Sequence, residues 1–345
     1  MGWRWRGWSS AIEGGEIHPS PPAPLPEGEG RMKRGPDALR PRREIDRRTG
    51  LAKVAYIGVG NMGQAKILRL LGAGHEVTAY NRTVDKTRVV RDAGAKIASS
   101  AAAAVEGADV VMSSVTNDEA SREVWTGLNG ILRGPVTPAM LLAECSTLSH
   151  DWVVELAGIV QSRGLRYIDL PVAGRPDAAE AGELRVYAGC STQELDELRP
   201  VLAAFSKKIF HFGPAGAGTA YKLIYNLLGV IQVASVAEAM VQCEAAGIDL
   251  NVAAEAFALG YTGSKHVAHH SAVMAEGKRN QPVGFSGRGR LKDSQYGVQL
   301  AEKLGRQALI GSAASAVFGQ MVNSGLGELN DSELIDALRA LAARR

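Results

Sequence analysis

Short apolar runs alternate with amphipathic stretches along the chain from Leu51 to residue 170. The apolar runs have the length of strands and occupy residues 53–59, 76–81, 109–115, 140–146 and 166–170. Between them lie segments with the spacing of amphipathic helices, including 62–73, 84–92 and 150–163. A strand buried on both faces reads as a continuous apolar run. The alternation therefore predicts a doubly wound parallel sheet with right-handed helical crossovers.

The pattern changes after residue 213. Two further strand-like runs come before this point, at 184–189 and 208–212. Helix-like segments dominate after it, at 216–246, 250–259, 263–276, 289–304, 306–324 and 331–343. Turn-forming residues mark the junction at Gly213, Pro214, Gly216 and Gly218. We therefore expect an α/β domain over residues 51–213 and an all-α domain over residues 214–345.

Residues 1–50 differ in composition from the rest of the chain. They hold seven of the 14 prolines and three of the five tryptophans, and they show no helical or strand period. Such a segment buries too little apolar area to offset the entropy of ordering it. We interpret it as a disordered extension, or as translation from a start codon upstream of the natural one, with Met32 as an alternative start. Acidic residues such as Glu13 and Glu16 disfavour a transit peptide, and the missing apolar run disfavours a secretory signal.

Charge and cysteine content narrow the class of protein. All of the net charge of +3 falls within residues 1–50, so the remaining chain is balanced and shows no bulk sign of nucleic-acid binding. The three cysteines, Cys145, Cys190 and Cys243, form no CxxC pair, and an odd number fits a reducing cytoplasm. The nearest approach to a membrane span, 223–237, is interrupted by polar residues. We expect a cytoplasmic protein with no nucleic-acid or membrane partner.

A glycine-rich turn follows the first predicted strand, in the segment VAYIGVGNMGQA. Gly58, Gly60 and Gly63 have the spacing G-x-G-x-x-G between a strand and a helix. The first glycine of such a turn permits the tight bend, the second lets the backbone approach a pyrophosphate, and the third lets strand and helix pack closely. The phosphates then lie at a helix N-terminus, which favours anions. The motif predicts a Rossmann-type dinucleotide-binding domain.

The second predicted strand ends in Asn81-Arg82-Thr83. A site selective for NAD(H) places Asp or Glu here, where it binds the ribose 2′-hydroxyl. Arg82 can instead pair with a 2′-phosphate, and Thr83 can add a hydroxyl donor. The alternative is that Arg82 is a solvated turn residue. The sequence favours NADP(H), with NAD(H) as the weaker candidate.

Lys222 and Asn226 lie four residues apart in AGTAYKLIYNL, on one face of a predicted helix. Hydride transfer to a carbonyl leaves charge on oxygen, which a nearby donor must neutralise and protonate. A lysine can do this when an apolar setting lowers its pKa. Taken alone, the pair would indicate a surface lysine on an amphipathic helix. Beside a dinucleotide-binding domain, it indicates a nicotinamide-dependent oxidoreductase.

Six motifs in register resemble those of the β-hydroxyacid dehydrogenases, over residues 52–340. They are GVGNMGQA, NRT, ECSTLS, DLPVAGRPDAAEAGEL, AGTAYKLIYN and FSGRGRLKDSQYGVQLA. The family includes 3-hydroxyisobutyrate dehydrogenase, tartronate semialdehyde reductase and glyoxylate/succinic semialdehyde reductase. The resemblance implies a Rossmann-type domain followed by an all-α domain that serves substrate binding and dimer formation. It also implies an enzyme that interconverts a small hydroxyacid and its semialdehyde or keto form, as a homodimer or higher homo-oligomer.

The resemblance also implies roles for individual residues. Lys222 takes the acid/base role, and Asn226 supports it or binds substrate. Lys292 is expected to reach the cofactor or the substrate carboxylate, and Asp293 to be structural. The implied cofactor contacts are Gly58, Gly60, Asn61, Met62, Gly63, Asn81, Arg82, Thr83, Val115, Thr147 and Lys292.

The substrate loop departs from the family pattern. Where members usually have Ser-Gly-Gly, this chain has Ala173-Gly174-Arg175. Ala173 cannot donate a hydrogen bond, Gly174 keeps its backbone N–H, and Arg175 either binds a carboxylate or points to solvent. We expect these three residues at the substrate site, with a substrate that differs from the usual semialdehyde acids or is held differently.

Four polar residues, Ser264, His266, His269 and His270, share the predicted helix 263–276. We interpret the histidines as cleft-edge or surface residues, because no carboxylate completes a metal-ligand set with them. No metal site is expected.

Three alternative functions stay open. Imine reductases share a similar NRT turn but usually lack lysine at the position of Lys222. Decarboxylating phosphogluconate dehydrogenase carries His where this chain has Tyr225. A non-catalytic NADP-binding module would explain the altered loop at Ala173 and Arg175, although Lys222, Asn226 and Lys292 argue for an enzyme.

Overall fold

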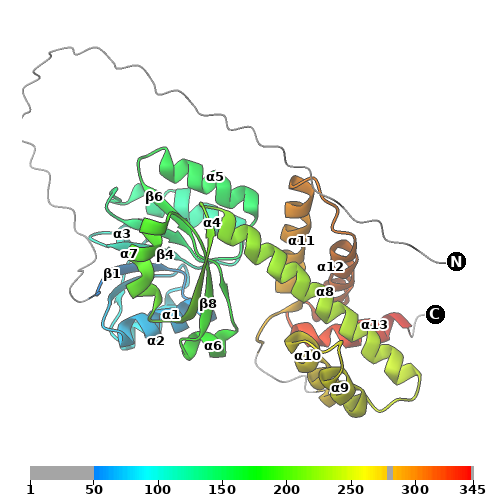
Figure 1. Cartoon of the computed structure of the whole chain (residues 1–345). Coiled ribbons are helices and arrows are strands. Elements are labelled where there is room, and N and C mark those ends of the chain that lie inside the picture. Colours follow the sequence, from blue (N-terminus) through cyan, green and yellow to red (C-terminus); the bar gives the residue numbers. More distant parts are fainter. Residues whose placement is uncertain (1–49, 278–282, 343–345) are drawn as a thin grey trace, which may run out of the picture. The chain divides into compact units, whose positions relative to one another are not determined.

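The structure is a computed structural model that describes residues 50–277 and 283–342. The expectations for residues 1–49, including the alternative start at Met32, lie outside these ranges. Within them, a sheet covered by helices is followed in sequence by a group of helices (Figure 1). The predicted class, a Rossmann-type doubly wound sheet followed by an all-α domain, is confirmed.

Six strands form the parallel part of the sheet, in the order β3-β2-β1-β4-β5-β6. Their bounds are β1 (Lys53–Ile57), β2 (Glu76–Tyr80), β3 (Lys96–Ile97), β4 (Val110–Ser113), β5 (Leu141–Glu144) and β6 (Arg166–Asp169). The chain moves outward from β1 in one direction and from β4 in the other, so the strand order reverses between these two neighbours. In open α/β sheets, ligands bind at such a switch point, beside the carboxyl ends of the strands.

The sheet continues beyond β6 with three strands that break the parallel pattern. β8 (Leu184–Gly189) is antiparallel to β6, β7 (Val172–Ala173) is antiparallel to β8, and β9 (Ser206–Gly213) is parallel to β8. The strands β3 and β7 have two residues each, too few to form an apolar run that would predict a strand from the sequence. Most of β9 is exposed, including Phe210 and Phe212, so the predicted apolar run lies on the surface rather than in the core.

Alternate residues of β1 enter two different cores, as expected for a sheet covered on both faces. Tyr56 packs in one core with Leu70 and Phe205, whereas Ile57 packs in the other with Trp152. The covering helices are α1 (Asn61–Gly72), η1 (Val84–Thr87), α2 (Arg88–Asp92), α3 (Ala101–Ala104), α4 (Asp118–Thr126), η2 (Ile131–Arg133), α5 (His150–Gln161), α6 (Pro176–Glu180) and α7 (Thr192–Leu202). The single helix predicted over 84–92 divides into the 3-10 turn η1 and α2.

The remaining helices pack around α8 (Ala217–Ala245). They are α9 (Leu250–Leu259), α10 (Lys265–Glu276), α11 (Gly287–Lys303), α12 (Leu309–Met321), η3 (Val322–Leu326), η4 (Asp331–Glu333) and α13 (Leu334–Ala342). Val230 and Val233 of α8 form their common core with Phe318. The helix predicted over 306–324 ends earlier as an α-helix and continues as the π turn η3, inside which Gly325 adopts a φ of 83°.

By length and composition, α8 is the one helix of the described ranges that could cross a membrane, with a mean hydropathy of 1.5 in its most apolar window. The core helix of a soluble protein meets the same criterion. Residues along α8, such as Val230 and Met240, are buried by the surrounding helices. Packing within the protein therefore accounts for the buried face of α8, whereas Ile224 and Leu228 are exposed.

Candidate active site

The glycine loop lies at the carboxyl end of β1, at the switch point of the sheet. Gly58 has a φ of 100°, and a Cβ there would lie 2.0 Å from the carbonyl oxygen of Ser114, after β4. A Cβ on Gly63 would lie 2.0 Å from the carbonyl oxygen of Gly58. A side chain at either position would collide with a backbone carbonyl group, so both residues have to be glycine.

Gly60 is a glycine for a different reason. No protein atom lies within 4 Å of the position that its Cβ would take. Helix α1 begins at the next residue, Asn61, and has no side-chain cap, so the N–H groups of its first turn, including that of Met62, are available to an anion. An open glycine before an uncapped helix fits a pyrophosphate, which needs close approach to the backbone.

Asn81 holds the glycine loop from the end of β2. Its Oδ1 accepts a hydrogen bond of 2.9 Å from the backbone N–H of Val59, and its Nδ2 donates to the carbonyl oxygen of Thr83 at 2.8 Å. These hydrogen bonds fix the loop that surrounds the dinucleotide position. The predicted contact of Asn81 with the cofactor stays a prediction.

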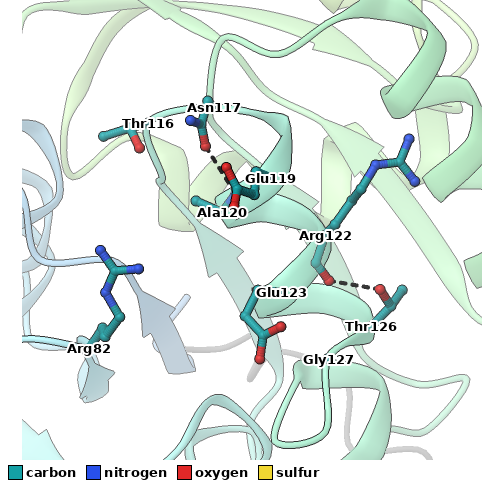
Figure 2. Close-up of a pocket in the computed structure, with 9 residues that line it drawn as sticks. All are labelled: Arg82, Thr116, Asn117, Glu119, Ala120, Arg122, Glu123, Thr126 and Gly127. Atoms are coloured by element: carbon teal, nitrogen blue, oxygen red, sulfur yellow. Dashed lines mark hydrogen bonds between the residues drawn. The ribbon is translucent and has the colours of Figure 1, made fainter.

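Arg82 and Thr83 are exposed beyond Asn81. Arg82 lines a cavity of about 680 Å³ whose other lining residues come from α4 and its flanking turns: Thr116, Asn117, Glu119, Ala120, Arg122, Glu123, Thr126 and Gly127. Figure 2 shows the Arg82 guanidinium on one side of this space and the side chains of α4 on the other. Within the described ranges Arg82 forms no ion pair, so its guanidinium is available to an anion.

The loops after β4 and β5 are tied together and to α11. The N–H of Val115 donates to the Ser146 hydroxyl at 2.7 Å. From α11, Lys292 donates to the carbonyl oxygens of Thr116 at 3.0 Å and Thr147 at 2.7 Å. The Lys292 ammonium holds both loops, and with them Val115 and Thr147, at the switch point. Its predicted contact with the cofactor or substrate stays a prediction.

The first turn of α8 is capped by the sheet. Its N-cap residue, Gly216, has a φ of 95° and offers no side-chain cap. Asp169, at the end of β6, supplies one, because its two oxygens accept from the N–H groups of Gly216 at 2.7 Å and Thr219 at 2.6 Å. Burial raises the pKa of Asp169 to about 6, although these hydrogen bonds oppose the rise.

Lys222 and Asn226 lie on one buried face of α8, 7% and 5% exposed. Asn226 donates from Nδ2 to Asp293 of α11 at 2.6 Å. The Lys222 ammonium forms no hydrogen bond with any residue of the described ranges and lies 5.3 Å from the centre of the Tyr225 ring. Burial, with Arg290 and Lys292 nearby, lowers the pKa of Lys222 to about 8, although Asp293 opposes the shift. This amine can exchange a proton near neutral pH.

The substrate loop turns toward α10. Ala173 is buried in β7, and Gly174 has a φ of 139°, where a Cβ would lie 2.6 Å from Cδ2 of Leu184. Arg175 does not simply point to solvent, because its Nη1 lies 2.7 Å from Nε2 of His269 on α10. The loop therefore places the Arg175 guanidinium against α10.

Sequence reasoning missed a buried ionic cluster around Asp331. Arg290, 6% exposed, donates from Nε to Asp331 Oδ2 at 2.8 Å, and Nε2 of His270 lies 3.2 Å from the same oxygen. His270 is 2% exposed, which corrects its interpretation as a cleft-edge or surface residue. Burial, with Arg290 nearby, lowers the pKa of His266 to about 4. The available signal was the spacing of Arg290 and Asp293, which places both on one face of α11.

Within residues 50–277 and 283–342, no group of three or more His, Cys, Asp or Glu side chains is arranged to hold a metal ion.

Two family profiles match the chain and together follow its two parts. The profile of the NAD binding domain of 6-phosphogluconate dehydrogenase matches residues 53–213. The profile described as NAD-binding of NADP-dependent 3-hydroxyisobutyrate dehydrogenase matches residues 216–338.

Individual proteins give the same picture. An uncharacterised oxidoreductase of Bacillus subtilis, YfjR, is 30% identical over 83% of this chain and all of its own length. The structure of 3-hydroxyisobutyrate dehydrogenase from Mycobacterium tuberculosis with L-serine is 28% identical, with a TM-score of 0.76 over 84% of this chain and 99% of that one. An imine reductase from Myxococcus stipitatus is 20% identical, with a TM-score of 0.54 over 83% of this chain and 99% of that one, a likeness of fold alone.

Proposed function

This chain belongs to the β-hydroxyacid dehydrogenase family and is an NAD(P)-dependent dehydrogenase acting on a CH–OH group; from this premise we propose that it prefers NADP(H) and uses Lys222 as its general acid and base. The substrate is a small hydroxyacid in one direction and its semialdehyde or keto form in the other. The observation that carries the proposal is the buried Lys222 ammonium, which donates no hydrogen bond to any residue of the described ranges.

Lys222 and Asn226 have different roles at the carbonyl oxygen of the substrate. In the direction of reduction, the bound nicotinamide supplies a hydride to the carbonyl carbon. Lys222 donates a proton to the oxygen as negative charge develops there, and the resulting neutral amine regains a proton from solvent. Asn226 donates a hydrogen bond of 2.6 Å to Asp293, which fixes its amide on the face of α8 that also carries Lys222. In this proposal the N–H of Gly174 binds a polar atom of the substrate.

The preference for NADP(H) rests on the end of β2. No carboxylate occupies the positions of Asn81, Arg82 and Thr83, and the exposed Arg82 faces the cavity beside α4. A guanidinium there can form charge-assisted hydrogen bonds with a 2′-phosphate. Glu119 and Glu123 line the same cavity and would weaken this attraction, so the ratio of the two cofactors is a sharper test of the assignment than NADPH activity alone.

Turnover of a carbonyl tests the proposal directly. Glyoxylate, succinic semialdehyde, tartronate semialdehyde and methylmalonate semialdehyde would be offered with NADPH, with NADH in parallel, while cofactor absorbance is followed. The Lys222→Met variant should lose reduction by about 10²- to 10⁴-fold and still bind NADPH. Reduction at the wild-type rate in this variant would show that another group supplies the proton.

Imine reduction is the competing reaction on this fold. A protonated imine carries its own proton, so its reduction would not require an acid at Lys222. Cyclic imines offered to the wild type and to Lys222→Met therefore separate the reactions, because an imine reductase would keep its rate in the variant.

We further propose that a second copy of the chain covers the exposed side of α8. Ile224 and Leu228 are each 55% exposed there, and Leu309 and Ile310 of the adjoining α12 are 72% and 69% exposed. Such a group of exposed aliphatic residues is typical of an interface. Ile224→Asp should shift the sedimentation of the protein toward monomer, and Ala203→Asp, at the exposed residue that follows α7, should not.

A further inference from the structure

Arg290 is a buried cation with unused donors. Its side chain is 6% exposed, its Nε donates to Asp331, and its guanidinium lies 4.6 Å from the centre of the Phe285 ring. Neither Nη1 nor Nη2 forms a hydrogen bond with a residue of the described ranges. Both groups therefore keep donors that an acceptor outside the described residues can use.

His270 lies near the same carboxylate as Arg290. Its Nε2 is 3.2 Å from Asp331 Oδ2, and its Nδ1 is 2.8 Å from the carbonyl oxygen of His266. Asp331 occupies only the Nε edge of the Arg290 guanidinium, so the Nη groups keep their donors.

A glycine on α8 brings the Arg290 guanidinium beside the proposed catalytic face. Lys222, Asn226 and Gly229 recur at spacings of four and three residues and so lie on one side of the helix. A Cβ at Gly229 would lie 3.3 Å from Arg290 Nη1 and 3.1 Å from His266 Nε2. The free edge of the guanidinium therefore lies next to α8, about one turn past Asn226 and about 10 Å along the axis from Lys222.

We propose that Arg290, with His266 beside it, binds an acidic group of the substrate at the end remote from the reacting carbonyl. This inference rests on the proposed reduction at Lys222. It names the substrate class as an oxo acid whose carboxylate, phosphonate or sulfonate is separated from the carbonyl by several bonds. Glyoxylate, whose two functional groups are adjacent, cannot reach Lys222 and Arg290 together.

Matched pairs of aldehydes test the subsite. Adipic semialdehyde would be compared with hexanal, and succinic semialdehyde with butanal, each with NADPH. The readout is the ratio of kcat/KM for the acid to that for the neutral aldehyde. We expect the wild type to favour the acid, most strongly in the longer pair. Arg290→Met should reduce this ratio by about 30-fold or more, as expected when one partner of a buried charged contact is removed.

Two further variants keep the test decisive. Arg290→Lys retains the pairing with Asp331 and so protects the fold, but it loses the forked donors and should also lower the ratio. Arg288→Lys is the matched control, because Arg288 lies two residues away, is exposed and pairs with Glu328. It should leave the ratio unchanged. A wild-type ratio near one, or a ratio that both Arg290 variants leave unchanged, overturns the subsite.

The subsite and the proposed function fail in different ways. Equal reduction of acid and neutral aldehydes would leave the dehydrogenase assignment standing and remove the subsite. If no carbonyl is reduced, binding of hexanoate to the NADP⁺-saturated protein decides, measured by calorimetry against hexanamide. Hexanoate binding that is lost in Arg290→Lys supports the subsite without the reaction, and no binding, or binding unchanged in the variant, overturns it.

Discussion

Asp169, at the end of β6, accepts a hydrogen bond of 2.6 Å from the backbone N–H of Thr219 in the first turn of α8. The two residues are 50 positions apart in the sequence. Lys222 follows Thr219 by about one turn of the helix. Asp169 thus fixes the first turn of α8, and with it the proposed acid/base residue Lys222, relative to the glycine loop on the same sheet.

Replacement of Asp169 by Asn should weaken this connection. Asn keeps the size of the side chain but turns one of its two acceptors into a donor, which would face an N–H of α8. We expect the free energy of unfolding to fall by about 1–3 kcal/mol and kcat to fall more than the affinity for NADPH. Denaturant unfolding and steady-state kinetics measure both. Asp196→Asn, on exposed α7, is the control and should change neither.

The pH dependence of the reaction should follow Lys222, whose pKa burial lowers to about 8. Reduction requires the ammonium form, so kcat/KM for reduction should decline above about pH 8. Oxidation requires the neutral amine, so its kcat/KM should rise with pH and level off above that value. Opposite profiles in the two directions would fit Lys222, and parallel profiles would assign the titration to another group.

The same shift predicts how stability depends on pH. Between about pH 8 and the ordinary lysine value of 10.5, the unfolded chain binds a proton at Lys222 that the folded chain has released. The free energy of unfolding of the wild type should therefore rise with pH across this window, relative to Lys222→Met. Urea unfolding below and above the window gives the comparison. A wild-type free energy of unfolding that falls with rising pH relative to Lys222→Met would contradict the lowered pKa.

Gly60→Ala separates ligand binding from folding. Its Cβ would meet no protein atom within 4 Å, and the backbone φ of −85° suits alanine. We expect stability to change by less than about 0.5 kcal/mol and NADP(H) affinity to fall by about tenfold or more, or about 1.4 kcal/mol. Fluorescence titration with NADPH measures the affinity. Gly63→Ala, whose Cβ would meet the Gly58 carbonyl oxygen at 2.0 Å, should instead be destabilised.

Arg82→Ala tests the choice of cofactor. Loss of charge-assisted hydrogen bonds to a 2′-phosphate should lower kcat/KM for NADPH by about 10- to 100-fold and leave that for NADH nearly unchanged. Arg88→Ala removes an exposed arginine of α2 and should leave the NADPH/NADH ratio as it is. An unchanged ratio in Arg82→Ala would show that Arg82 is a solvated turn residue.

Lys292→Met should disturb the switch point without touching the glycine loop. The variant loses the hydrogen bonds to the carbonyl oxygens of Thr116 and Thr147. We expect kcat to fall by at least about tenfold, because the loops that flank the nicotinamide position lose their support, at about 1 kcal/mol per hydrogen bond. Lys303→Met is matched to it, since Lys303 also extends from α11, to Asp151 of α5. Equal effects of the two variants would contradict a specific role for Lys292.

The features that sequence alone predicted are those written in neighbouring residues. The glycine spacing, the strand before it and the helix after it all lie within 54–65, so close approach at Gly58 and Gly63 could be anticipated. Lys222 and Asn226 likewise share a face through helical spacing alone. The class of the fold followed from the alternation of buried strands and helices, which the sheet order confirms.

The features that escaped prediction depend on residues brought together from a distance. Arg290 and Asp331 are 41 positions apart, and Lys292 meets Thr147 across 145. His270 was the nearer miss, since Val267, Ser271 and Met274 are buried at helical spacing around it, and their pattern placed it on the inner face of α10. A polar residue on such a face requires a partner, and only the fold reveals that the partner is Asp331.

Helix α8 also determines how the gene can be recombined. Its first turn is capped by Asp169, and its Tyr221 stacks on Phe212 of β9 at 4.0 Å, while its later turns form the core of the helical group. A cut between residues 213 and 216 would leave a buried carboxylate without donors on one fragment and an uncapped helix on the other. Chimaeras that exchange cofactor or substrate specificity within this family should therefore take the carboxyl edge of the sheet and the opening turns of α8 from the same parent.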